Sequence, residues 1–225
     1  MKEAIRSLVL SLGADVCGFA AIDRFEAAPK GYSPADLFPA CRSVVVFGVA
    51  LPAALLTVDS RYLYGHYNDV CIGQVDNIAL TAAKALERDF GTAAAPVPCD
   101  GPYDSWDQQK LEGRGLISMK HAAVLAGIGS LGKSTMLINS RFGNRLTVGA
   151  ILTDATLASD EPAASLCPPS CRRCLEACPT GALDGTTAEQ ARCRPHAYAK
   201  NARGFSIVAC NACRTACPLR FGADR

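Results

Sequence analysis

Eight of the twelve cysteines lie within residues 167–225, and this clustering constrains the fold more than any other feature of the chain. Residues 167–179 read CPPSCRRCLEACP and residues 210–218 read CNACRTACP, with Cys193 between the two runs. Bacterial ferredoxins with two clusters carry C-x2-C-x2-C-x3-C-P runs, in which the fourth cysteine of a run ligates the other cluster. The pattern therefore predicts two [4Fe-4S] clusters and electron transfer at this end of the chain.

The same rule divides the eight cysteines into two complete ligand sets. One predicted cluster takes three ligands from the first run and one from the second, namely Cys167, Cys171, Cys174 and Cys217. The other predicted cluster takes Cys178, Cys193, Cys210 and Cys213. The first gap has three residues instead of two, and the second run lacks its leading cysteine. Cys193 replaces that cysteine, and we expect a long loop over residues 194–209 to bring it into place.

A structural zinc site and disulfide bonds are the alternatives for these cysteines. Zinc takes four ligands, commonly from C-x2-C pairs, and has no use for the two C-x3-C-P endings. Disulfide frameworks are typical of small secreted scaffolds. Iron-sulfur ligation remains the preferred interpretation.

The start of the chain lacks the pattern of a secretory signal, because Glu3, Arg6 and Asp15 interrupt its apolar residues. No apolar run approaches the roughly eighteen residues that a membrane span requires. We therefore expect a cytoplasmic protein with no membrane association. The other four cysteines are scattered singly and are predicted to be reduced and mostly buried; they are Cys17, Cys41, Cys71 and Cys99.

Charge is unevenly distributed along the chain. Residues 167–225 carry nine Lys and Arg against four Asp and Glu, whereas the formal net charge of the whole chain is only +2. A basic surface attracts tRNA or an acidic protein. Two thiolate-ligated clusters are themselves negative, and nearby arginines that offset this charge are the simpler explanation.

The rest of the chain predicts an α/β (α+β) fold, with a mixed-sheet domain over residues 1–160 and a two-cluster ferredoxin-like domain over residues 161–225. Apolar periodicity predicts helices over residues 2–12, 69–90 and 119–125. Short runs rich in β-branched residues predict strands over residues 16–20, 43–50, 94–99, 136–139 and 146–153. Residues 100–115 are polar and are expected to form a surface loop that borders a pocket, and residues 158–166 form the linker between domains.

Residues 127–135 read GIGSLGKST, which satisfies the P-loop pattern G-x-x-x-x-G-K-[ST] and also G-x-G-x-x-G. Both nucleotide-binding motifs require a strand before the glycines and a helix after them. Here the preceding residues predict a helix and the following residues predict a strand. The order is inverted, so an ATPase is a minor alternative.

The stretch KHAAVLAGIGSLGKSTMLIN over residues 120–139, followed by cysteine runs ending in CPTGAL and CPL, resembles the epoxyqueuosine reductase family. It is similar more remotely to the cluster-bearing end of corrinoid-dependent reductive dehalogenases. DVCGFA and SVVVFGVAL near the start also look like this family's opening strands. The resemblance is strong from about residue 119 onward and weak before it. Family members place a single cysteine between the two runs as a ligand, which supports Cys193.

The resemblance implies that electrons pass through both clusters to a base-off cobalamin, whose reduced cobalt acts on the substrate. It also implies that the glycine-rich segment lies at the corrinoid. Gly129 and Gly132 then allow close approach, and Lys133, Ser134 and Thr135 are candidates for contacting the corrinoid periphery. An electron donor of the flavodoxin or ferredoxin type is the implied partner, with tRNA or a corrinoid protein as further partners.

One family feature has no counterpart at the matching position. Epoxyqueuosine reductases carry an acidic residue upstream of the glycine-rich segment that protonates the substrate, and ungapped counting places Gly113 there. The adjacent Glu112 is the candidate catalytic acid, and three aspartates upstream are substitutes: Asp100, Asp104 and Asp107.

Two classes of function therefore remain open. The first is a corrinoid-dependent reductase that acts on a modified nucleoside or another small electrophile. The second is an electron-delivery protein that reduces a corrinoid or a partner protein without turnover of its own. A ferredoxin with an uninvolved extra domain is a weaker third possibility.

Overall fold

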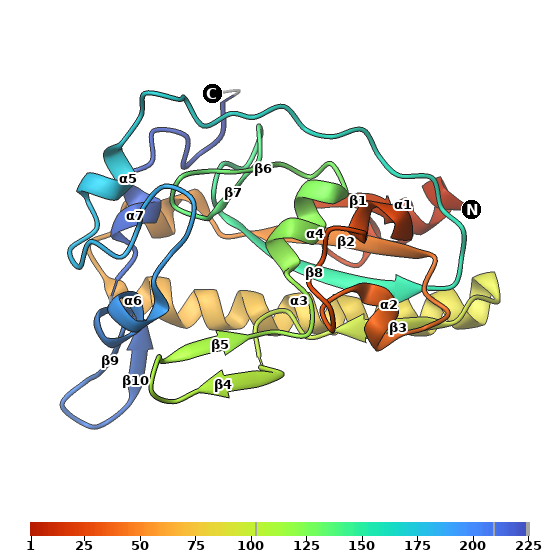
Figure 1. The fold of residues 1–225 in the computed structure, drawn as a ribbon, viewed down its shortest axis with the longest axis horizontal. Helices are drawn as coiled ribbons and strands as arrows, with labels where there is room; N and C mark the ends of the chain where they lie inside the picture. The colour runs from red at the N-terminus through yellow and green to blue at the C-terminus, as the bar shows by residue number, and fades with distance from the viewer. Residues whose placement is uncertain (102, 209, 224–225) are drawn as a thin grey trace.

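A four-stranded sheet with the strand order β1-β2-β8-β3 forms the centre of the computed structural model (Figure 1). The structure describes residues 1–101, 103–208 and 210–223. The sheet strands are β1 (Val16–Ala21), β2 (Ser43–Ala50), β3 (Ala94–Val97) and β8 (Leu146–Thr153). Each neighbouring pair is antiparallel. The predicted α/β class is confirmed, but the sheet is antiparallel where a mixed sheet was expected.

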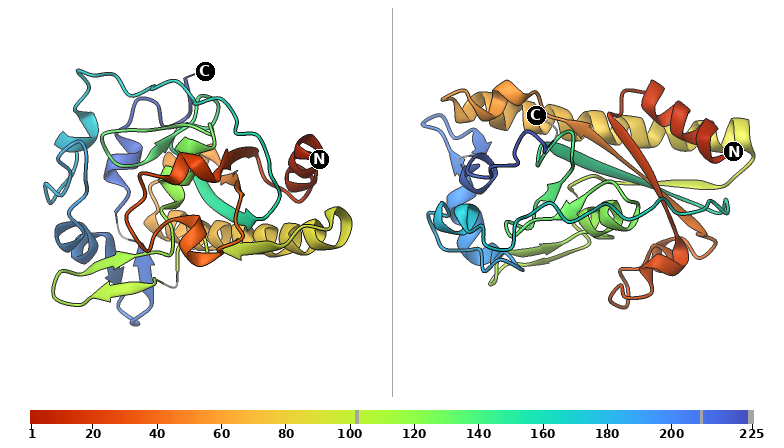
Figure 2. Two further views of the ribbon diagram at one scale, coloured as in Figure 1. Left: turned by 45° about the vertical axis from the view of Figure 1, so that its right-hand side comes forward. Right: turned by 90° about the horizontal axis from the view of Figure 1, so that it is seen from above.

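Helices and loops cover both faces of this sheet. Helices α1 (Lys2–Ser11) and α3 (Arg61–Phe90) lie on one face, and α2 (Pro34–Leu37) and α4 (Met119–Leu125) lie on the other (Figure 2). Strand β2 is buried along nearly its whole length. Its Val45 and Phe47 pack with α1 and α3, and its Val44 and Val46 pack with α4. Because strand side chains alternate between faces, a strand covered on both sides reads as a continuous apolar run.

Helix α3 spans thirty residues and begins eight residues before the predicted start. Its N-cap is Ser60, and it ends at Gly91, which adopts a left-handed φ of 65°. The first turns were missed because exposed Tyr62 and Tyr67 hide the apolar stripe. Gly65 also lowers helix propensity, but a Cβ there would lie 3.2 Å from the Val208 nitrogen, so glycine lets β10 approach.

The glycine-rich segment is a helix end followed by a hairpin, which explains why it is not a P-loop. Gly127 follows α4 with φ 72°, and the Ile128 nitrogen donates to the Ala123 carbonyl, as in a Schellman cap. The hairpin strands β6 (Ser130–Leu131) and β7 (Leu137–Ile138) come next. The tip between them holds residues 132–136. The inverted order predicted from the sequence is therefore present.

The segment over residues 100–115 contains a short hairpin that was predicted as loop. Its strands are β4 (Ser105–Asp107) and β5 (Glu112–Arg114). Alternation over only three residues on each side is too short to be recognised in a polar sequence. The expectation that this segment borders a pocket is nevertheless met, as shown below.

The linker over residues 156–166 has no regular secondary structure and runs back along the sheet domain. Asp160 fixes it to α1, with its carboxylate 2.6 Å from Lys2 Nζ and 3.0 Å from Arg6 Nη2. Burial opposes ionisation of this carboxyl group, but the hydrogen bonds from Lys2 and Arg6 outweigh burial and hold its pKa below the usual value. These contacts hold the linker against α1 before the chain enters the cysteine-rich segment.

The cysteine-rich segment contains three short helices and one hairpin. The helices are α5 (Arg173–Glu176), α6 (Gln190–Ala197) and α7 (Ala212–Thr215), and the strands are β9 (Tyr198–Lys200) and β10 (Ser206–Val208). The long loop expected after Cys193 is thus the end of α6 and this hairpin. Among the described residues, 3-10 turns also lie at Ile22–Phe25 and Ala53–Leu56. Over the described ranges, no helix combines the length and apolarity that crossing a bilayer requires.

Candidate metal centres and ligand cavity

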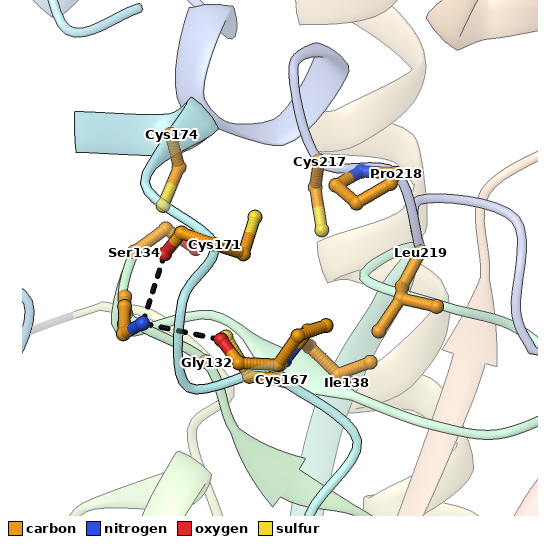
Figure 3. Close-up of a pocket in the computed structure, with 11 residues that line it drawn as sticks. Gly132, Ser134, Ile138, Cys167, Cys171, Cys174, Cys217, Pro218 and Leu219 are labelled. Atoms are coloured by element: carbon orange, nitrogen blue, oxygen red, sulfur yellow. Dashed lines mark hydrogen bonds between the residues drawn. The ribbon is translucent and has the colours of Figure 1, made fainter. Parts of the chain in front are cut away.

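Four cysteines line one small pocket and form the first cysteine site: Cys167, Cys171, Cys174 and Cys217. The first two lie in the loop before α5, the third lies in α5 and the last follows α7. The sulfur atoms of Cys171, Cys174 and Cys217 point into a shared space (Figure 3). These are the residues that the sequence predicts as ligands of one cluster. Their role as metal ligands stays a prediction.

Lys133 holds the loop that carries the first cysteines. Its Nζ donates to the carbonyl oxygens of Pro168 at 3.1 Å and Cys171 at 2.8 Å, and also to that of Pro169. Lys133 itself lines the pocket of the first cysteine site. An ammonium has three donors, so these contacts use them all. The predicted corrinoid contact of Lys133 stays a prediction, while the structure gives the side chain an anchoring role.

The second cysteine site consists of Cys178, Cys193, Cys210 and Cys213. Burial raises the pKa of the Cys193 thiol, and the nearby Cys178 and Cys210 raise it further. Burial likewise raises the pKa of Cys213, and Cys210, Cys193 and Cys178 add to this effect. Thiols influence one another in this way only when they lie close together. Cys193 and Cys213 of this set also line one cavity, so the structure brings these two predicted ligands together.

Metal binding at these sites requires loss of the thiol protons, because the thiolate is the ligand. Burial raises the pKa of Cys174 and Cys217 at the first site as well. At the second site the Ala182 nitrogen donates to Cys178 Sγ at 3.3 Å, a bond that stabilises a thiolate. Within the part of the chain that the structure describes, no three His, Cys, Asp or Glu side chains group closely enough to bind a single ion.

A cavity of about 750 Å³ lies against the second cysteine site, with Cys193 and Cys213 in its wall. The other walls come from the end of β3, the β4–β5 hairpin, the start of α4 and the β6–β7 hairpin tip. Binding cavities for small molecules commonly have volumes of about 300–1,000 Å³. The cavity can therefore hold a ligand directly beside the second cysteine site.

Two of the five predicted cofactor residues reach this cavity. Thr135 lines it with a left-handed φ of 59°, which is rare for a β-branched residue. Ser134 is buried and lines both the cavity and the first cysteine site. Gly129 and Gly132 instead pack against Ile138, where a Cβ would contact that residue. These glycines shape the hairpin, and direct ligand contact by them stays a prediction.

The candidate acid Glu112 does not line the cavity. Its carboxylate accepts from Arg114 at 3.2 Å, so it is engaged in an ion pair. Asp100, which follows β3, lines the cavity directly. The role predicted for Glu112 remains untested, but Asp100 is better placed to exchange a proton with a ligand.

Basic side chains outnumber acidic ones around the cavity. Arg114, Lys120, His121 and Arg194 line it together with Asp100. The side chain of Lys120 is exposed at the open cavity. Protein atoms around the cavity still desolvate its amine. This partial burial lowers the pKa of its amine, and Arg214 lowers it further. His121 Nδ1 lies 2.7 Å from Ser118 Oγ at the start of α4.

An arginine clamp joins the hairpin wall of the cavity to helix α6. Arg194 Cζ lies 5.0 Å from the Tyr103 ring centre and 4.9 Å from that of Trp106, and its Nη2 donates to the Tyr103 hydroxyl at 2.9 Å. Gln190 receives a hydrogen bond from the Gly113 nitrogen at 3.0 Å and donates to the Gly113 carbonyl at 3.1 Å. Sequence reasoning missed this clamp, because its partners are about ninety residues apart in the chain.

Replacing Arg194 with leucine is expected to loosen this wall, since it removes a hydrogen bond and cation–π contacts of about 0.5–1 kcal/mol each. Trp106 is the only tryptophan, so its fluorescence reports on the hairpin. We expect a red-shifted emission and faster tryptic cleavage at Lys110 in the variant. Arg192→Leu removes an exposed arginine two residues away and is the control. An Arg194→Leu spectrum identical to that of the control would show that the clamp does not order the hairpin.

Comparisons with known proteins agree with this architecture. No protein-family profile matches the chain. The epoxyqueuosine reductase of Bacillus subtilis is 24% identical over 268 aligned positions, which take in 100% of this chain and 64% of that protein. This chain resembles the epoxyqueuosine reductases. The sequence-based expectation of that resemblance is therefore confirmed.

Solved structures show the same fold for the epoxyqueuosine reductase-like chain. A crystal structure of epoxyqueuosine reductase with an epoxyqueuosine-modified tRNA stem loop superposes with a TM-score of 0.70 at 22% identity, covering 99% of this chain and 66% of that one. A reductive dehalogenase structure described for B12-dependent dehalogenation superposes with a TM-score of 0.73 at 19% identity, covering 97% of this chain and 31% of that one.

The chain spans less than two thirds of the length of the curated relatives that it matches. The share is 64% for the Bacillus subtilis protein and 38% for the protein of Gloeobacter violaceus. The activity, substrate and partners of those whole proteins are therefore carried over only as proposals.

Proposed function

We propose that this chain is an iron-sulfur oxidoreductase of the epoxyqueuosine reductase type, with two [4Fe-4S] clusters that deliver electrons to a ligand in the cavity. The observation that carries the proposal is that Cys193 and Cys213 of the second cysteine site also line the 750 Å³ cavity. An electron on a cluster at that site is then next to whatever the cavity binds.

The two cysteine sites give the electron path a direction. The first site and the cavity lie on two sides of the β6–β7 hairpin tip, where Ser134 lines both. An electron donor of the flavodoxin or ferredoxin type would therefore deliver electrons at the first site, and the second site would pass them on. The domain division at residue 160 is part of this proposal. It is supported by a central sheet that ends at Thr153 and by cysteine runs that begin at Cys167.

Cobalamin is the cofactor that we propose for the cavity, and when bound it would supply a strongly reducing metal for attack on an electrophilic substrate. Thr135 and the neighbouring backbone would contact the corrinoid periphery, and the basic residues Arg114, Lys120 and Arg194 would face its phosphate or that of the substrate. Asp100 would hold the proton that the reduced substrate takes up. A tRNA carrying epoxyqueuosine is the proposed substrate, since a relative of the same fold is known with such a stem loop.

Anaerobic titration with hydroxocobalamin tests the cofactor proposal. We expect a saturable absorbance shift with one corrinoid bound per chain. Thr135→Gly removes a cavity side chain and relieves a left-handed conformation that costs roughly 1–2 kcal/mol, so this variant should fold well yet bind corrinoid more weakly. Leu111→Gly relieves the same kind of conformation, φ 50°, away from the cavity and is the matched control.

The outcomes of this titration separate the candidate functions. No shift with the wild-type chain would refute the corrinoid proposal. Binding followed by turnover of epoxyqueuosine-containing tRNA supports the reductase. Binding without turnover would instead indicate an electron-delivery protein that reduces a corrinoid; the relatives from Bacillus subtilis and Gloeobacter violaceus, both named epoxyqueuosine reductase, do not favour that alternative.

A further inference from the structure

Arg214 lies between ligands of the two proposed clusters. It belongs to helix α7, directly after Cys213 of the second cysteine site and three residues before Cys217 of the first. Only 8% of its surface is exposed. A guanidinium is permanently charged, so its positive charge is buried beside the cysteine sites.

The polar contacts of Arg214 do not neutralise this charge. Its Nη1 donates to the Asn144 carbonyl oxygen, and its Nη2 lies 4.0 Å from the Met136 sulfur, which is a weak acceptor. Its Nε is fully buried and has no hydrogen-bond partner. The Tyr64 ring lies 6.0 Å from Cζ. Across the described residues, no carboxylate forms an ion pair with Arg214.

An unpaired charge in such a place is costly. Removing an ion from water carries a penalty of several kcal/mol unless an opposite charge compensates it. Cys213, a proposed cluster ligand, directly precedes Arg214 in the chain, and the charge of Arg214 opposes the effect of burial on the Cys213 thiol. A cluster held by four thiolates provides the missing negative charge, and each added electron makes it more negative.

Resting on the proposed function, we propose that Arg214 is the buried counter-charge of the cluster at the second cysteine site. A fixed positive charge favours the reduced form of a cluster, because net charge and hydrogen bonding set cluster potentials. Arg214 therefore raises the potential of the cluster beside the cavity and favours electron transfer from the first cluster to the second. Arg214 acts through the cluster, whose potential its positive charge sets, and does not contact the substrate.

Redox titration of the reconstituted full chain tests this role. In Arg214→Met we expect the equilibrium constant for reduction of the second cluster to fall at least tenfold. This corresponds to a reduction potential lower by about 59 mV for a one-electron couple. Arg214→Lys keeps the charge and should keep the potential close to that of the wild type. Arg203→Met removes an exposed arginine in the β9–β10 turn and controls for net charge. The Cys193→Ser background, expected to keep only the first cluster, assigns the shift to one cluster.

Thermal unfolding supplies a second, independent readout. In the iron-free chain Arg214 has no counter-charge, so Arg214→Met should unfold at the same temperature as the wild type or a higher one. In the reduced, iron-loaded chain the same variant should unfold at a lower temperature. A purely structural arginine would instead destabilise both forms and leave the potentials unchanged, and that result would overturn the proposal.

These outcomes are distinct from a failure of the proposed reductase. A shifted potential in a chain that binds no corrinoid would keep the role of Arg214 and refute the cofactor. An unchanged potential in a corrinoid-binding chain would refute the role of Arg214 alone. A chain that takes up no iron under anaerobic reconstitution would overturn both.

Discussion

Replacing Cys193 with serine is expected to lower the iron content of the anaerobically reconstituted chain from about eight atoms to about four. Cys193 lies in α6 between the two cysteine runs, and its thiol shares a region with Cys178 and Cys210. Loss of one thiolate removes a quarter of the ligands of one cluster and leaves the first cysteine site complete. Iron and acid-labile sulfide per chain measure the effect.

Cys41→Ser is the matched control, because Cys41 is a buried single cysteine in the sheet domain. It should retain the full iron content. If Cys193→Ser also retains the iron of two clusters, the ligand assignment is wrong and another residue completes the second set. Equal loss in both variants would point to general misfolding.

Replacing Asp100 with asparagine is expected to lower the turnover of epoxyqueuosine-containing tRNA by about 10²–10⁴-fold, the usual effect of losing a general acid. Asparagine keeps the size of the side chain, so binding of substrate and corrinoid should change little. Asp100 lines the cavity, whereas Glu112 does not line it and is paired with Arg114. Measurement of kcat and of corrinoid binding on the same preparation separates catalysis from assembly.

Glu112→Gln is the paired variant and should keep most of the activity. A large loss of activity in Glu112→Gln together with normal activity in Asp100→Asn would contradict the role of Asp100. Glu112, the candidate predicted from the sequence, would then be the acid. Normal turnover in both variants would mean that the proton comes from another group, such as Lys120.

The core strands and first helix could be predicted closely from the sequence. Buried strands β2 and β8 read as uninterrupted apolar runs, and α1 shows an apolar stripe ending at a glycine. Local patterns of this kind are strong because burial on both faces favours apolar residues along most of the strand. The early start of α3 and the β4–β5 hairpin were missed because exposed aromatic residues and short polar strands carry no such pattern.

The candidate site divides in the same way. The cysteine spacing predicted two groups of four, and the structure brings each group together, although ligation itself stays a prediction. The hydrogen bonds of the Lys133 amine could not be predicted, because its partners Pro168 and Cys171 lie about 35 residues away in the chain. Arg214 and the Arg194 clamp likewise depend on contacts between distant segments.

The most direct test of the central claim is electron paramagnetic resonance of the anaerobically reconstituted, reduced full chain. The account predicts signals of two interacting [4Fe-4S] clusters per chain, with the signal of the cluster beside the cavity altered when hydroxocobalamin is added. A chain with only one cluster, or one whose cluster signals do not respond to a bound corrinoid, would contradict it.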